Sequence, residues 1–311
     1  MPATDPGTII QFGSGHPGED GSAAFEAALL AALEPAVRNV LFFPFHAMPP
    51  DSGDLARFTR IHGARIPGWI RCAQLRPPEL PDNLAEILAW LHEADLIVLG
   101  SGFPEPYIDV IRRLEQPPDL LRQLHLAGKH FVGYSAGTLA IGEGYFRPFT
   151  GRDLLLQLDL LDHISLAQPT RDELEATMRG LLKRDDAQEF LDALRARLEA
   201  EEPLTAEQDT FLAARHWMEQ SAGFRLNPGI TGNPHFGGRF HYLECHLRIL
   251  GELFPDYLHV GLPNACALVT RHDGGSRRLT FRAARTRLDG MYLKGGEEPV
   301  ALRDGDLLPL S

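Results

Sequence analysis

The chain has 311 residues, of which 44% are hydrophobic and 23% charged, a composition typical of a soluble globular protein. Its formal net charge of −12 argues against nucleic acid as a partner, because the phosphates would be repelled. No stretch approaches the roughly 18 apolar residues that a membrane helix needs, and the first residues do not resemble a secretory signal. Cys72, Cys245 and Cys266 are too scattered for a disulfide framework or a thiolate zinc site. We therefore expect a cytoplasmic protein with no membrane partner and no bound metal.

The first half of the chain alternates short apolar runs with helical segments. The pattern predicts strands at 8–12, 40–45, 94–102 and 130–134, and helices at 22–37, 83–93 and 106–126. The stretch 46–82 is rich in proline, glycine and arginine, which predicts mostly irregular structure. Strands that alternate with helices need crossover connections. We therefore expect an α/β fold with a mainly parallel, doubly wound sheet and helices on both faces.

A helical insertion is predicted at residues 170–222, which are charged and nearly free of glycine. Thr170 and Thr205 each begin a capping-box pattern, which marks the start of a helix. We expect two or three amphipathic helices here, inserted in a single α/β domain that spans residues 1–311. Such an insertion is most often a lid, a homodimer surface or a partner site.

The α/β pattern resumes at residue 224. A strand-like segment leads into Asn233-Pro234-His235-Phe236, and a helix is predicted at 240–254. Residues 258–270 read as a late pair of strands, and residues 277–296 read as β-hairpins.

The clearest local motif is Gly133-Tyr134-Ser135-Ala136-Gly137, which follows a predicted buried strand and precedes a helical segment. A G-x-S-x-G sequence at such a junction holds its serine on a tight, strained turn above the sheet. The backbone N–H of Ala136 would then be placed to donate to an oxyanion. Ser135 is therefore a candidate nucleophile, whereas the simplest alternative is a helix-capping serine in a glycine turn.

A nucleophilic serine needs a base, and the chain offers thirteen histidines. His235 is the best candidate because it lies in a turn directly after a predicted strand, in the later part of the same α/β pattern. This context alone leaves a core or surface histidine as an equal alternative.

The motifs together resemble the dipeptidase E and cyanophycinase family of serine peptidases, which have a class I glutamine amidotransferase-like fold. GYSAG at 133–137, NPHF at 233–236 and GLPNACAL at 261–268 follow one another as in that family, and ADLIVLGSG at 94–102 resembles its oxyanion-loop strand. The resemblance covers about half of the chain. It implies a Ser135–His235 peptidase without a cofactor, acting on a short peptide, with an acidic residue next to the scissile bond.

The oxyanion loop departs from the family pattern, because Phe103 stands where a side-chain donor is usual. Only backbone groups at Gly102 and Ala136 would then hold the oxyanion. Arg239 occupies the position of an arginine in the cyanophycinase branch, which makes it a candidate for binding a substrate carboxylate.

The group that orients the histidine is a second departure. The family offers two positions, and they correspond here to Asp153, eighteen residues after the serine, and to Asn264. An asparagine can orient an imidazole but stabilises its cation less than a carboxylate does. A site that uses neither residue is the remaining alternative. The third departure is the separation of one hundred residues between Ser135 and His235, which the insertion explains.

Other classes of protein stay open at this point. A non-catalytic binding protein on the same fold would explain Phe103 and Asn264, and an esterase of the α/β-hydrolase kind is permitted by the order of the residues. His241, Glu244, His246 and His259 could suggest a metal site, but their spacing favours a polar helix face.

Overall fold

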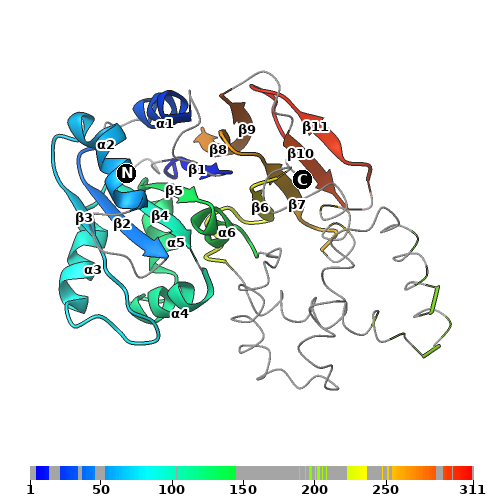
Figure 1. The fold of residues 1–311 in the computed structure, drawn as a ribbon, viewed down its shortest axis with the longest axis horizontal. Helices are drawn as coiled ribbons and strands as arrows, with labels where there is room; N and C mark the ends of the chain where they lie inside the picture. Colours follow the sequence, from blue (N-terminus) through cyan, green and yellow to red (C-terminus); the bar gives the residue numbers. More distant parts are fainter. Residues whose placement is uncertain are drawn as a thin grey trace.

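The computed structural model describes most of the α/β part of the chain. The described ranges are 5–13, 22–33, 37–45, 53–102, 104–115, 117–144, 223–236, 254–284, 290–295 and 297–309, with single residues between 189 and 208 and at 247 and 251. Figure 1 shows the elements that these residues form.

A seven-stranded sheet forms the centre of the protein (Figure 1). Its strands are, in spatial order, β3 (Ile70–Cys72), β2 (Val40–Phe45), β4 (Leu96–Gly102), β5 (His130–Tyr134), β1 (Ile9–Phe12), β8 (Cys266–Asp273) and β9 (Ser276–Ala283). The first five run parallel, whereas β8 and β9 are antiparallel. The predicted fold class, a mainly parallel α/β sheet, is confirmed.

Helices cover both faces of this sheet because successive strand residues point to opposite sides. Ile10, Val40 and Val98 pack on the face that carries α1 (Ser22–Ala31) and α2 (Asp54–His62). The 3-10 helix η1 (Gly63–Arg65) directly follows α2. Their neighbours Ile9, Leu41 and Ile97 pack on the other face. That face carries α3 (Leu84–Glu93), α4 (Pro104–Leu114), α5 (Leu120–Leu126) and α6 (Ala136–Ile141).

A second sheet lies beside the first (Figure 1). It contains β11 (Val300–Leu302), β10 (Gly290–Lys294), β7 (Leu258–Leu262) and β6 (Ile230–Pro234) in this order. β6 and β7 run parallel, while β10 is antiparallel to β7. Ile230 and Val260 of this sheet share a buried cluster with Leu268 and Phe281 of β8 and β9, so the two sheets pack through one apolar core.

Five expectations need correction. The strands within 277–296, β9 and β10, belong to different sheets and do not form a hairpin with each other. The helix expected at 106–126 is two helices, because Pro117 and Pro118 lie in the break and lack the backbone donors that a continuous helix needs. The stretch 46–82 contains α2 and β3. The strands within 258–270 belong to different sheets and do not pair with each other. The helix expected at 22–37 ends at Ala31.

Most of the predicted insertion, 170–222, lies outside the described residues. Thr205 and Gln208, which define one of its expected helix starts, are among the described residues. The Thr205 backbone N–H donates to Gln208 Oε1 at 2.9 Å, and the Gln208 N–H donates to Thr205 Oγ1 at 3.2 Å. This reciprocal pair is the predicted capping box.

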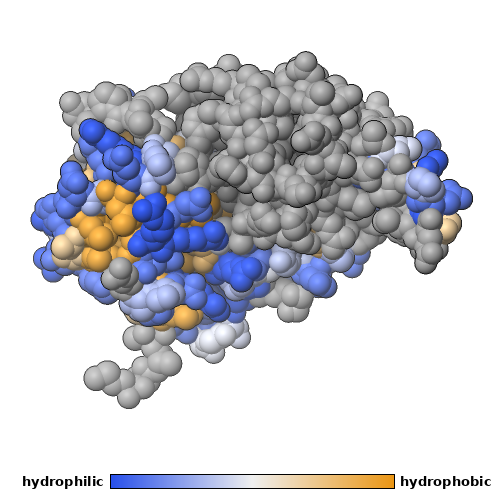
Figure 2. Space-filling view, turned by 90° about the horizontal axis from the view of Figure 1, so that it is seen from below, coloured by the Kyte–Doolittle hydropathy of each residue, from blue (hydrophilic) through white to orange (hydrophobic). Residues whose placement is uncertain are grey.

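The surface over α3 and α4 is partly apolar. Figure 2 views the molecule from below, on the side of these helices, and shows hydrophobic residues at the surface between hydrophilic ones. Leu84 and Leu88 of α3 are half-buried against the core beneath. Among the helices that the structure describes, none combines the length and the apolar character that a membrane span requires.

Candidate active site

The structure places Ser135 at the sharp turn between β5 and α6. Its backbone angles are φ 49° and ψ −106°, outside the regions that an ordinary residue occupies. Such strain costs about 1–3 kcal/mol and persists only where the surroundings hold it in place. The turn lifts the half-buried side chain of Ser135 over the carboxyl edge of the parallel strands.

Two glycines allow this turn to form. A Cβ on Gly137 would lie 2.0 Å from the carbonyl oxygen of Leu99 in β4, and a Cβ on Gly133 would lie 2.6 Å from the carbonyl carbon of Gly137. No side chain fits at either position. The glycines of the motif are therefore required by the close approach of α6 to β4 and β5.

His235 lies one residue beyond β6 and faces Ser135. Its Nε2 is 2.8 Å from Ser135 Oγ, so the serine hydroxyl can donate a hydrogen bond to the imidazole. His235 has a positive φ of 60°, and its backbone N–H donates to the carbonyl of Gly13 at 3.0 Å. Gly13 directly follows β1, so the histidine turn is attached to the first sheet beside the serine.

The ends of several parallel strands thus meet around one point. Gly102, with φ 134°, is the last residue of β4, and Ala136 is the first residue of α6. Asn264 lies in the turn after β7, and the register that pairs Pro234 with Leu262 brings this turn beside His235. Sites in open α/β sheets form at such carboxyl edges.

Not every polar side chain close to Ser135 in sequence belongs to this point. Glu143, which follows α6, forms an ion pair with Arg225 at 3.0 Å and accepts from the Gly229 N–H at 3.1 Å. It holds the loop before β6 and cannot also orient the histidine. Asp153, Arg239 and Phe103 lie outside the described residues.

His259 is not on a polar helix face, as was expected, but in the buried strand β7, where it belongs to a polar network with β6. The Thr231 hydroxyl donates to Nδ1 of His259 at 2.7 Å, and Nε2 of His259 donates to the Phe254 carbonyl at 3.0 Å. Burial lowers the pKa of His259 to about 4, so the ring is neutral. Both ring nitrogens are used, and His259 is therefore not a metal ligand. The described part of the chain contains no cluster of three or more His, Cys, Asp or Glu side chains that could hold a metal ion.

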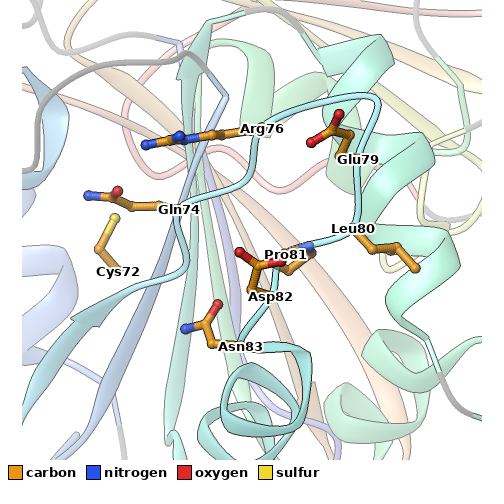
Figure 3. A pocket seen from close by; sticks show the side chains of 8 residues that line it. All are labelled: Cys72, Gln74, Arg76, Glu79, Leu80, Pro81, Asp82 and Asn83. Atoms are coloured by element: carbon orange, nitrogen blue, oxygen red, sulfur yellow. The ribbon is translucent and has the colours of Figure 1, made fainter.

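A cavity of about 650 Å³ lies elsewhere, in the loop between β3 and α3 (Figure 3). Its lining is polar and of mixed charge, with Arg76, Glu79 and Asp82 among the labelled side chains. Cys72 lies at its margin, and burial raises the pKa of this thiol to about 11, so it is not a reactive nucleophile. Neither Ser135 nor His235 lines this cavity.

Fold and geometry together define the class of this protein. It is a mainly parallel α/β protein with a serine on a strained turn and a histidine hydrogen-bonded to that serine.

No protein-family model and no curated protein matches the sequence. Among solved structures, the chain is similar to a peptidase from an acI-B1 Actinobacterium, with a TM-score of 0.56, 16% identity, and 99% of this chain and 98% of that chain covered. It is also similar to a Listeria monocytogenes EGD-e protein provisionally named Peptidase E, with a TM-score of 0.48, 12% identity and coverage of 88% and 98%. The first likeness shows a shared fold.

Proposed function

We propose that this protein is a serine peptidase that hydrolyses a peptide bond in a short peptide through an acyl-enzyme on Ser135. The observation that carries the proposal is the 2.8 Å contact between Ser135 Oγ and His235 Nε2 at a strained turn on the carboxyl edge of the sheet. The shared fold with a structure described as a peptidase supports it, as does the resemblance to the dipeptidase E and cyanophycinase family.

The chemistry follows from these two side chains. His235 Nε2 takes the proton of the Ser135 hydroxyl as the oxygen attacks the peptide carbonyl, and then gives it to the leaving amine. The backbone N–H groups of Ala136 and Gly102 would hold the negative charge that develops on the carbonyl oxygen. Water then attacks the acyl-enzyme, with His235 as general base, and releases the second product. Asn264 is the described candidate for orienting the imidazole.

The substrate preference rests on the resemblance alone. A peptide with an acidic residue next to the cleaved bond would suit an arginine near the site, and Arg239 is the candidate. The insertion at 170–222 enters after the serine and leaves before the histidine, so we propose that it covers the cleft and restricts it to short peptides.

A fluorophosphonate probe tests the proposal before any substrate is known, since it labels only an activated serine. The wild-type protein should be labelled at Ser135, and Ser135→Ala should lose both labelling and hydrolysis while keeping its circular dichroism spectrum. Ser276→Ala, at an exposed position in β9, is the matched control and should label as the wild type does. An unlabelled wild type would favour the non-catalytic binding protein. Rapid turnover of simple esters with no turnover of peptides would favour the esterase.

A further inference from the structure

A buried carboxylate lies behind the serine turn. Glu26 of α1 is only 2% exposed, and three side chains from other elements bind it. Arg57 of α2 forms an ion pair with Oε2, while Nε2 of His62 lies 3.0 Å from Oε1. The Tyr134 hydroxyl donates to the same Oε1 at 2.6 Å. Two donors thus share one oxygen, and one of them comes from the residue before Ser135.

The carboxylate is ionised and saturated with partners. Burial alone would raise the pKa of the Glu26 carboxyl, but the His62 hydrogen bond, the Arg57 charge and the Tyr134 hydrogen bond together lower it below its usual value. A hydrogen bond to a charged acceptor is shorter and stronger than one between neutral groups. The Tyr134 hydroxyl is therefore held firmly at a fixed point between α1 and α2.

The Tyr134 ring is fixed as well. It stacks on Phe12 of β1, with the ring centroids 5.0 Å apart and the planes at 4°, and the Arg57 guanidinium lies 5.9 Å from its centroid. Tyr134 itself is 3% exposed. A residue held at its ring and its hydroxyl gives the next residue a fixed starting point for its backbone. Ser135 needs such a fixed point, because its strained angles relax unless the surroundings determine them.

We propose that Glu26 and Tyr134 are positioning residues for Ser135: the carboxylate holds the tyrosine hydroxyl, and the tyrosine holds the strained serine turn in the geometry that meets His235. This inference rests on the proposed function of Ser135. The competing account is that the cluster only fastens α1 and α2 to the sheet. Under that account, every contact to Glu26 contributes to stability in the same way and none affects the serine in particular.

The shared oxygen provides a matched pair of variants. Tyr134→Phe removes the hydroxyl that reaches Glu26 Oε1, and His62→Leu removes the other donor to the same atom. Each loses one buried hydrogen bond, but only the first lies next to the serine. The measurements are the second-order rate of fluorophosphonate labelling and the thermal midpoint, with labelling carried out well below the midpoint so that each variant is folded.

We expect Tyr134→Phe to slow labelling at least about tenfold and His62→Leu to stay within about threefold of the wild type, because small misplacements of a reacting atom are costly. Equal slowing in both variants, or a Tyr134→Phe rate within about threefold of the wild type, would overturn the inference. Should Tyr134→Phe fail to fold, Glu26→Gln replaces it in the comparison, since it weakens the acceptor at nearly constant shape. The same slowing and the same overturning results then apply. An unlabelled wild type would instead refute the proposed function, so the two failures are distinct.

Discussion

At the scale of single residues, the candidate site depends on a few positions where only one residue type fits. Gly137 must lack a side chain because α6 lies against Leu99, and this contact sets how far Ser135 projects over the sheet. The G-x-S-x-G pattern predicts such a junction from sequence, because its glycines have a steric reason. Tyr134 occupies the variable position of the motif, so nothing in the pattern indicated its contact with Glu26. That contact joins residues 108 positions apart and depends on the folded arrangement.

Asn264 offers a prediction at the same scale. If this residue orients His235, Asn264→Asp places a carboxylate beside the imidazole and stabilises its cation. We expect labelling by a fluorophosphonate to become about tenfold faster and the midpoint of its pH profile to move upward. The pH profile separates this effect from a change in serine geometry, which would alter the rate without moving the midpoint.

The control for this prediction is Asn83→Asp, which adds the same charge at an exposed position before α3. It should leave both the rate and the midpoint unchanged. If Asn264→Asp also leaves them unchanged, Asn264 does not orient the histidine. Asp153 or a serine–histidine dyad would then be the better candidate.

At the scale of helices and strands, the sequence predicts the elements that have a long apolar pattern. β2, β4 and β5 are buried along almost their whole length and were placed within two residues. β3 was missed because it has three half-buried residues at the edge of the sheet. α2 was missed because, of its described side chains, it buries only Phe58 and His62 and it lies in a segment rich in turn-forming residues.

The second sheet could not be predicted from local patterns. β7 and the first five residues of β8 are buried, and only Pro263, Asn264 and Ala265 separate the two strands. Ala265 has a φ of 59°, which turns the chain so sharply that the two strands enter different sheets. Contacts between residues distant in sequence decide which strands pair. Neither the hydrophobicity of a segment nor the spacing of its apolar residues indicates these contacts.

The contact of β6 with β1 and α6 supports a prediction about strand position. A Cβ on Gly232 would lie 2.8 Å from Gln11 Nε2 and 2.9 Å from Thr138 Cγ2. Gln11 cannot move away easily, because its amide donates to the Thr138 carbonyl and accepts from Asn227. Gly232→Ala should therefore displace β6, which carries His235 three residues later.

We expect Gly232→Ala to lower the free energy of unfolding by about 1–3 kcal/mol, the usual effect of overpacking, and to slow labelling about tenfold. Denaturant unfolding and labelling of the folded protein measure these two effects. Gly63→Ala is the control, since Gly63 has helical angles and its added Cβ would meet only Thr59 Cγ2 at 3.4 Å. Labelling of Gly232→Ala at the wild-type rate would show that this contact does not set the serine–histidine geometry.

At the scale of the whole molecule, the candidate site lies where two sheets meet. Ser135 follows a strand of the first sheet and His235 follows a strand of the second, so the pair forms only when the sheets are packed together. The apolar cluster that includes Val260 and Leu268 holds the sheets in contact. Loosening of this core should therefore separate serine from histidine before either sheet unfolds.

The buried His259 makes the stability of this assembly depend on pH. Burial lowers its pKa from the ordinary value of 6.5 to about 4, so between these values the unfolded chain binds more protons than the folded one. Stability must then fall as the pH drops from about 6.5 to about 4. Of the fall between pH 7 and pH 5, His259 should contribute about 2 kcal/mol. His125, whose burial also lowers its pKa to about 4, adds in the same direction.

Urea unfolding of the wild type, His259→Gln and His92→Gln at pH 7 and pH 5 measures this contribution. His259→Gln cannot take up the proton, so its loss of stability between the two pH values should be about 2 kcal/mol smaller than that of the wild type, whatever its absolute stability. His92 is exposed at the end of α3, so His92→Gln makes the same replacement away from the buried network. The contrary result is that His259→Gln loses as much stability between pH 7 and pH 5 as the wild type does. In that case His259 is protonated at pH 5 in the folded wild type, which requires β6 and β7 to open enough to admit water. The packing between the two sheets would then be looser than the hydrogen bonds of His259 to Thr231 and Phe254 imply.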